Sequence, residues 1–409
     1  IIKLYDSKRN VDIVVLAEEL KKMNKLDEIG GMSYLVELTE KVSSPAHARE
    51  YALIVKEKYI LRELIKSSTK IIEDAYSESR NLDLLLDDAQ RQIFDLSQKN
   101  LMHSFTSPRE LAQQCMDILI KAKKEGKPII GIPSGFTTLD RLTSGFKKQE
   151  FIIIAARPSQ GKTAFALNIA YNVGILKNIP VIIFSLEMNK ESLVQRMIAS
   201  AISYDSSKLR SGRFDKEIWP SITTELDKFS NSNIWIDDTP GLNILDIRTR
   251  ARKLILDIQS KRPDITDFLI IVDYLQLVKG VGRYESRQQE VSEISRLMKD
   301  MARSLNVPVI ALSQLNRRTE ERTKEGHRPQ LSDLRESGAL EQDADIVLMI
   351  HREYPYTRNE SDRRNATIIV AKNRNGMTGN VPLLFFEEYT RFNEPAPDIK
   401  DIEEEEIAI

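Results

Sequence analysis

A short run in the middle of the chain, residues 151–171, constrains the fold more than any other segment. It reads FIIIAARPSQGKTAFALNIAY: six apolar residues, a polar loop that ends in Gly-Lys-Thr, and a mostly apolar helical stretch. Strand, loop and helix in this order are typical of a phosphate-binding loop, whose usual pattern is G-x-x-x-x-G-K-[ST]. Ala156 stands where that pattern opens with glycine. A small residue is tolerable at a strand exit, so we interpret residues 157–163 as a nucleotide-binding loop.

Several positions of this loop suit phosphate binding. Gly161 allows close approach of the backbone, Lys162 can reach the terminal phosphates, and the Thr163 hydroxyl can ligate Mg²⁺. The alternative is a chance Gly-Lys-Thr at the start of a helix, which the strand before it and the helix after it disfavour. The residues that we expect to bind the nucleotide are Arg157, Pro158, Ser159, Gln160, Gly161, Lys162 and Thr163.

From residue 129 onward, short apolar runs alternate with helical segments. The runs cover residues 151–156, 180–186, 233–237, 267–273, 307–313 and 345–350. Near-continuous hydrophobic strands separated by helices predict a largely parallel sheet with helices on both faces. Residues 365–372 and 380–388, joined by NRNGMTG, predict a terminal hairpin. The fold class that we predict is therefore α/β, with the sheet domain spanning residues 129–395.

Two acidic residues follow apolar strands. Asp273 ends the run FLIIVD, and Glu187 follows VIIFSL. The carboxyl ends of parallel strands meet at one edge of a sheet, which is also where the phosphate loop begins. We expect Asp273 to hold Mg²⁺ together with Thr163, and Glu187 to act as the general base that activates water. Either acid alone could be a helix cap, but two of them beside a phosphate loop favour catalysis.

Polar segments after other strands are further candidates. Gln314 ends the apolar strand before it, where its amide could sense the γ-phosphate. The charged segment 317–335 carries six Lys/Arg against four Asp/Glu, a balance equally compatible with a solvated surface. A second candidate loop, 279–290, contains Arg283 and Arg287.

The terminal hairpin carries two basic residues, Lys372 and Arg374, at its tip. If its strands lie at the end of the sheet, this tip is too far from its own phosphate loop. It could instead reach the nucleotide of a neighbouring subunit as an arginine finger. The alternative is a pair of ordinary exposed turn residues.

The first part of the chain is helical in pattern. Residues 1–98 contain amphipathic segments, and residues 45–98 predict a helical hairpin that serves packing or partner binding. Because the chain begins with isoleucine inside a helical pattern, we expect this domain to be incomplete. Residues 99–128 read as a linker whose capped helix, 107–125, must bury its apolar face against its own chain or a neighbour. Residues 396–409 predict a disordered acidic tail.

Composition excludes several classes of protein. The net charge of −1 argues against a generally basic coating for nucleic acid, although a local basic groove stays open. One cysteine cannot form an internal disulfide, and the four histidines lack zinc-ligand spacing. The sequence has no apolar run near the ~20 residues of a membrane helix. We expect a soluble cytoplasmic protein with no membrane partner.

Taken together, the motifs resemble those of the DnaB-type replicative DNA helicases, which have a RecA-like motor domain. The matching stretches occur in the family's order: ARPSQGKT, FSLEM, DYLQL, ALSQLNRR, RPQLSDLRESGALEQDAD, and KNRNG followed by TG. They span residues 129–393, and the helical front end and linker extend the resemblance to nearly the whole chain. DLRESG, EQDAD and KNRNG are highly specific, whereas many NTPases share the phosphate loop. The family pattern itself has alanine at position 156.

The resemblance implies roles for individual residues. ATP and Mg²⁺ are the implied cofactors, with Glu187 as the catalytic carboxylate and Gln314 as the sensing glutamine. Lys372 and Arg374 are implied to act in trans on the ATP of the adjacent subunit. The residues implied to contact single-stranded DNA are Arg335, Glu336 and Gly338, with Arg283 and Arg287 on a looser match.

The resemblance also implies an assembly. It implies a homohexameric ring that translocates 5′→3′, with the linker helix docked on the next subunit. The N-terminal collar is implied to bind primase, and a helicase loader is a further implied partner. The implied setting is the cytoplasm of a bacterium, a plastid or a phage-infected cell.

Two other functions compete with the helicase. A RecA-like strand-exchange ATPase would share the core but form filaments, and the helical collar and the DLRESG loop speak against it. A non-hydrolysing adaptor would have lost the catalytic acid or the finger, whereas Glu187 and Arg374 are both retained.

Overall fold

The computed structural model describes two compact units, Ile1–Ser104 and Phe105–Ile409. The residues that it describes are 12–23, 25–41, 48–77, 85, 88–89, 91–93, 108, 111–113, 116, 120, 131–280, 282, 284–316, 327–334 and 338–396. Most of the linker helix expected at 107–125, and the acidic tail from residue 397 onward, therefore lie outside the described residues.

The N-terminal unit is helical where it is described. Its helices are α2 (Ile13–Lys22), α3 (Gly31–Lys41) and α4 (Ala48–Tyr76). Asp12 caps α2 by accepting a hydrogen bond from the backbone N–H of Val15 at 2.8 Å. Ala17, Leu26 and Leu35 form a small core between α2 and α3. Of the helical hairpin expected at 45–98, the first arm is α4, and residues 85, 88–89 and 91–93 of the second arm are helical.

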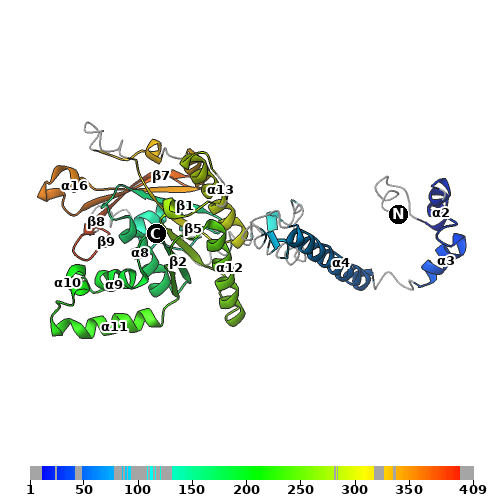
Figure 1. The fold of residues 1–409 in the computed structure, drawn as a ribbon, viewed down its shortest axis with the longest axis horizontal. Coiled ribbons are helices and arrows are strands. Elements are labelled where there is room, and N and C mark those ends of the chain that lie inside the picture. Colours follow the sequence, from blue (N-terminus) through cyan, green and yellow to red (C-terminus); the bar gives the residue numbers. More distant parts are fainter. Residues whose placement is uncertain are drawn as a thin grey trace. The chain divides into compact units, whose positions relative to one another are not determined.

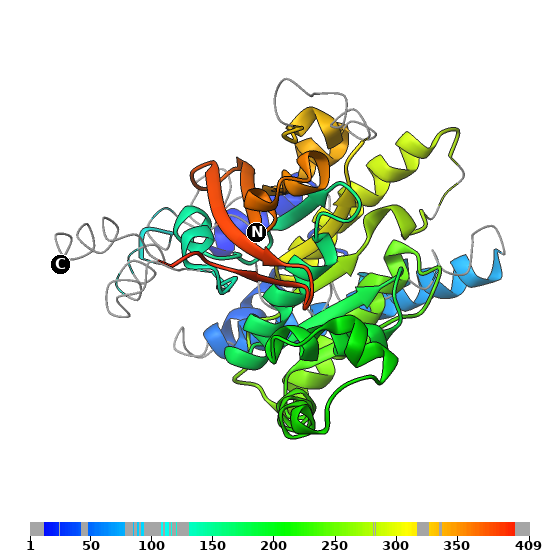
Figure 2. The same ribbon diagram turned by 90° about the vertical axis from the view of Figure 1, so that its left-hand side faces the viewer.

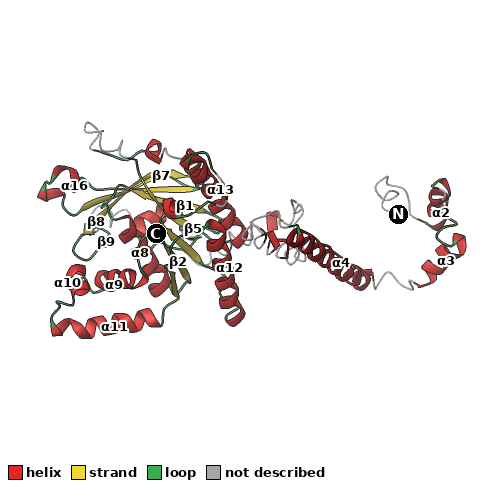
Figure 3. Cartoon of the chain, in the orientation of Figure 1, coloured by secondary structure: helices red, strands yellow, loops and turns green. Residues whose placement is uncertain are grey.

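The C-terminal unit is built on one nine-stranded sheet. Figure 3 shows its strands in yellow, with helices around them. The strand order is β3-β2-β4-β5-β1-β6-β7-β8-β9. The strands are β1 (Phe151–Ala156), β2 (Val181–Ser185), β3 (Ile234–Asp237), β4 (Leu269–Asp273), β5 (Val309–Gln314), β6 (Ile346–His351), β7 (Asn365–Asn373), β8 (Gly379–Phe386) and β9 (Arg391–Asn393). The pairs among β1 to β6 are parallel, and the pairs from β6 to β9 are antiparallel. The predicted largely parallel sheet and terminal hairpin are confirmed, and β9 is an additional strand.

Helices cover both faces of this sheet (Figure 1). Their bounds are α7 (Thr137–Thr143), α8 (Lys162–Tyr171, continued by a π-helical turn Asn172–Leu176), α9 (Lys190–Ala201), α10 (Ser206–Ser211), α11 (Trp219–Ser230), α12 (Ile244–Lys261), α13 (Arg287–Leu305), α15 (Gly338–Asp343) and α16 (Tyr354–Thr357). Helices α8 and α9 pack on one face, and α12, α13 and α15 on the other. Alternate residues of each central strand enter the two cores, which is why these strands are apolar without interruption.

The C-terminal edge of the sheet curls back over α8 (Figure 2). Phe392 of β9 packs against Phe165 of α8, with ring centroids 5.3 Å apart, and against Phe385 of β8 at 4.5 Å. The backbone N–H of Phe392 donates to the Asn168 side chain at 2.7 Å. The last strand thus returns to the helix that follows the phosphate loop.

Candidate active site

The phosphate loop follows β1 and opens α8, as the sequence predicts. Gly161 caps the helix with φ = 97°, a backbone conformation that glycine adopts without strain. A Cβ at this position would lie 2.9 Å from Cζ of Phe392. Glycine is therefore required both by the turn and by the aromatic ring that packs against it.

The loop borders a cavity of about 460 Å³ at the carboxyl edge of the parallel strands. The residues that line it include Arg157, Pro158, Ser159, Gly161, Lys162, Thr163, Glu187, Arg196 and Gln314. The structure thus brings together the loop, Glu187 and Gln314, which the sequence places far apart. Glu187 is exposed to this cavity, at the turn after β2.

Asp273 at the end of β4 lies against the start of α8. The Thr163 hydroxyl donates to its Oδ2 at 2.8 Å, and the ammonium of Lys162 lies 3.7 Å from its Oδ1. Oδ1 is buried and accepts no hydrogen bond from any residue that the structure describes. Such an orphaned carboxylate oxygen beside a hydroxyl is a donor set that a hard cation fills.

Burial disfavours the charged forms of both Asp273 and Lys162, and their mutual attraction offsets this only in part. Burial raises the pKa of Asp273 above its usual range, although Lys162 and Thr163 oppose the shift. Burial likewise lowers the pKa of Lys162, against the charges of Asp273 and Glu187. An anion near Lys162 and a cation near Asp273 would relieve both, as a metal-bound nucleotide does.

Two of the predicted loop residues use their side chains within the protein. The Arg157 guanidinium donates to the backbone carbonyl of Leu315, just beyond β5, at 2.7 Å. The Gln160 amide is buried and lies 3.5 Å from the carbonyl oxygen of Arg352. These contacts brace the loop against the ends of β5 and β6.

Lys372 and Arg374 lie at the opposite, amino edge of the sheet. Ile152 pairs with Ile346, which pairs in turn with Asn373. The hairpin tip is thus level with the start of β1, roughly 16 Å along the strand from the phosphate loop. An arginine side chain is shorter than that, so neither cation can reach its own loop.

The two cations contact the end of helix α15 in their own chain. Lys372 Nζ donates to the carbonyls of Glu341 and Gln342, at 2.5 and 3.2 Å. The Arg374 guanidinium donates to Asp345 Oδ1 at 3.4 Å and to the Gln342 carbonyl. The pairing between β6 and β7 is irregular just before Lys372, a bulge that redirects side chains.

The candidate DNA-contacting residues are described only in part. Gly338 begins α15, and Arg287 begins α13, with its guanidinium 2.5 Å from Glu290 Oε2. Arg335, Glu336 and Arg283 lie outside the described residues.

Comparison with known proteins identifies the family. Residues 131–394 match the DnaB-like helicase C terminal domain, and residues 1–57 match the DnaB-like helicase N terminal domain. The chain belongs to the DnaB-like helicases. It is a replicative, ATP-dependent DNA helicase.

Individual relatives agree with this assignment. The replicative DNA helicase DnaB of Geobacillus stearothermophilus is 45% identical over 392 residues, which cover 96% of this chain and 84% of that protein. The replicative DNA helicase DnaC of Bacillus subtilis is 43% identical over 390 residues, covering 95% and 84%.

Two solved structures are similar to this chain. An ATPase domain of known structure has 40% identity and a TM-score of 0.67, and the match covers 72% of this chain and all of that one. A DnaB-like replicative helicase, solved in a study of its interactions with primase, has 35% identity and a TM-score of 0.68, covering 96% and 90%.

Two arginines of this DnaB-like helicase lie beside the phosphate loop but were not predicted from the sequence. Arg196 of α9 lines the cavity beside the phosphate loop, where burial and Arg210 lower its pKa while Asp273 and Glu187 oppose the shift. Arg352 follows β6 and is almost fully buried; it donates to Glu387 at 2.6 Å and to the Ser159 carbonyl at 3.4 Å. Arg352 directly follows β6, so the reasoning from strand ends that singled out Asp273 applies to it as well. Nothing in the helical pattern of α9 singles out Arg196.

Proposed function

We propose that this helicase works as a homohexameric ring, which hydrolyses ATP to move 5′→3′ along single-stranded DNA and unwinds the duplex at the replication fork. One observation carries the proposal. The phosphate loop and the acids lie at the carboxyl edge of the sheet, while Lys372 and Arg374 lie at the amino edge. A site that needs both edges is completed only between neighbouring chains.

Within each site, the loop residues 157–163 would hold the phosphates, and Thr163 and Asp273 would hold Mg²⁺. The orphaned Oδ1 of Asp273 supports this assignment. Among the described residues, no group of three or more His, Cys, Asp or Glu could hold a metal, so phosphate oxygens and water would complete the shell. Mg²⁺ bound there would neutralise charge on the terminal phosphates.

Glu187 takes the proton of the attacking water, because its carboxylate faces the cavity from the strand next to Asp273. Gln314 reports the γ-phosphate from the end of β5. Arg374, assisted by Lys372, stabilises the charge that develops on the neighbour's ATP.

DNA is contacted by loops rather than by a basic surface. The proposed contacts are Arg335, Glu336 and Gly338, with Arg283 and Arg287 from the second loop. A few phosphate contacts in each subunit, summed over a ring, supply salt-dependent affinity to a chain whose net charge is only −1.

The N-terminal helical unit is the proposed docking site for primase. Its support is the primase interaction named for the similar solved helicase. A loader that places the ring on DNA and a bacterial cytoplasmic location complete the proposal. No helix among the described residues could span a membrane.

Two inactive variants should restore hydrolysis when they are mixed during assembly. The Glu187→Gln subunit keeps the Arg374 finger but lacks the general base of its own site. The Arg374→Ala subunit keeps an intact site but cannot supply the finger to its neighbour. If the finger acts in trans, about a quarter of the sites in a 1:1 mixture pair a competent site with a competent finger, half times half. DNA-stimulated ATP hydrolysis of the mixture measures this.

Each variant alone is the control, together with sedimentation to verify that the mixture assembles. A mixture that assembles and binds ATP but stays as inactive as its components would exclude action in trans.

A further inference from the structure

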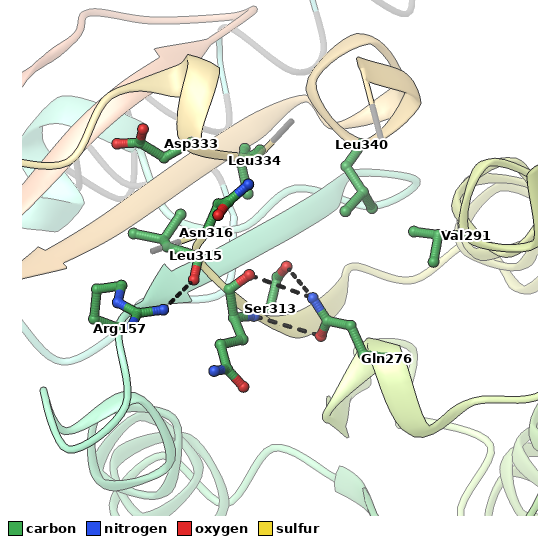
Figure 4. Close-up of a pocket in the computed structure, with 10 residues that line it drawn as sticks. Arg157, Gln276, Val291, Ser313, Leu315, Asn316, Asp333, Leu334 and Leu340 are labelled. Carbon is green, nitrogen blue, oxygen red and sulfur yellow. Dashed lines mark hydrogen bonds between the residues drawn. The ribbon is translucent and has the colours of Figure 1, made fainter. Parts of the chain in front are cut away.

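A second cavity lies between the phosphate loop and the segments that flank the proposed DNA loop (Figure 4). It has a volume of about 350 Å³. Arg157 lines it from the phosphate loop, and Leu334 and Leu340 line it from either side of residues 335–337. Gln276, from the turn after β4, and Ser313 and Gln314, at the end of β5, also line it, so the cavity lies between the phosphate loop and the segments beside the proposed DNA loop.

Gln276 spans this wall from the turn after β4. It lies in the 3₁₀ turn Leu275–Leu277, which begins two residues after Asp273. Its Nε2 donates to the Ser313 hydroxyl at 3.0 Å and to the Gln314 carbonyl at 3.4 Å, and its Oε1 accepts from the Gln314 backbone N–H at 3.4 Å. Figure 4 shows these contacts as dashed lines.

The chemistry of the backbone fixes this orientation. The N–H of Gln314 can only donate and its carbonyl can only accept, so the Gln276 amide must present oxygen to one and nitrogen to the other. The amide therefore contacts both backbone groups of Gln314, whose side chain lines the nucleotide cavity. The two bonds to Gln314 are long, so a small displacement breaks them.

The other end of Gln276 is tied to the second candidate DNA loop. Its backbone carbonyl accepts from the Arg287 guanidinium at 2.5 Å. Arg287 also pairs with Glu290, whose Oε1 accepts from the backbone N–H of Gly280 at 3.0 Å. One run of hydrogen bonds thus joins the end of β5 to both ends of the loop between β4 and α13.

We propose that Gln276 is a positioning residue, which transmits the state of the 279–290 loop to Gln314 and so couples DNA binding to hydrolysis. This role rests on the proposed sensing function of Gln314. Gln276 does not line the nucleotide cavity, so it acts through the backbone of Gln314 and not on ATP.

The test is Gln276→Met, which keeps the length of the side chain and removes its donors and acceptor. We expect the stimulation of ATP hydrolysis by single-stranded DNA to fall about 5-fold or more, while the KM for ATP stays within about 2-fold. Gln276→Glu keeps the acceptor for the Gln314 N–H, so its stimulation by single-stranded DNA should lie between that of wild type and that of Gln276→Met. Gln195→Met, an exposed glutamine of α9, is the matched control and should behave as wild type.

Epistasis separates this role from a structural one. In a Gln314→Ala background, Gln276→Met should cause no further loss of stimulation, because both act in one step. Full additivity, or wild-type stimulation in both Gln276 variants, would overturn the proposal for Gln276. If Gln314→Ala itself leaves stimulation intact, the sensing role of Gln314 fails instead.

Discussion

His351 is a buried residue of the motor domain whose protonation depends on pH. It ends β6 and is 8% exposed. Burial, together with Arg328 and His327, lowers its pKa from 6.5 to about 4. The nearest acid recorded for it, Glu353, is 4.0 Å away and more than half exposed, so it compensates little. His351 is therefore neutral in the folded protein at neutral pH.

Acidification should therefore destabilise the motor domain through His351. The unfolded chain takes up a proton below pH 6.5, whereas folded His351 stays neutral until about pH 4, so stability is lost as the pH falls through this window. We expect about 1–2 kcal/mol of the free energy of unfolding to be lost between pH 7 and pH 5, after allowance for solvent screening. The His351→Gln variant should not show this part of the loss.

Urea unfolding of wild type and His351→Gln at pH 7 and pH 5 measures this loss of stability. The two tryptophans, Trp219 and Trp235, both lie in the C-terminal unit and report its unfolding. Equal pH dependence in wild type and variant would show that His351 is not responsible.

The sequence allowed the positions of some candidate residues to be predicted, because their positions follow from a strand. Asp273, Glu187 and Gln314 were expected at one edge of the sheet because parallel strands end at a common edge, and their roles stay predictions. The contacts of Arg157 and Gln160 with the ends of β5 and β6 could not be foreseen, because they depend on the order of the strands. The proximity of Arg196 to the phosphate loop depends on how α9 packs on the sheet. The sequence pattern of α9 is that of an ordinary amphipathic helix.

Among the elements, the short strand β9 carries the ring that packs on the phosphate loop. It has three residues, too few for a recognisable alternation, which is why the sequence did not predict it. The longer strands were predictable because burial on both faces makes them continuously apolar. Phe392 of β9 meets Gly161, Phe165 and Phe385.

Removing the Phe392 ring should loosen the nucleotide site as well as the core. We expect Phe392→Ala to cost about 3 kcal/mol of stability, as for other buried phenylalanines, and to weaken nucleotide binding. The matched control is Phe386→Ala on β8, whose ring stacks on Tyr389 and does not line the cavity beside the phosphate loop. Chemical unfolding and titration with a fluorescent ATP analogue measure the two effects. Equal loss of affinity in both variants would mean that the ring does not act on the loop.

At the scale of the whole molecule, the two units have separate cores. The small N-terminal core contains Ala17, Leu26 and Leu35, whereas the two large cores of the C-terminal unit flank the sheet. The predicted boundaries at residues 98 and 128 stay predictions. The division at Ser104 and Phe105 falls within the expected linker.

The C-terminal unit should therefore fold and bind nucleotide alone. We expect a fragment of residues 105–409 to unfold in one cooperative transition and to bind an ATP analogue within about 3-fold of the affinity of the full chain. Calorimetry and fluorescence titration measure this. A fragment that is unfolded, or that binds more than about 10-fold more weakly, would show that the units depend on each other.

The contact of Phe392 with Gly161 also bears on how the protein is made. A ribosome releases the phosphate loop after β1 and releases β9 much later, after all the other strands of the sheet. Until that strand emerges, the nascent chain carries the complete Gly-Lys-Thr motif without the ring that packs on it. Within the C-terminal unit, the phosphate loop is thus translated well before the strand whose ring completes its packing.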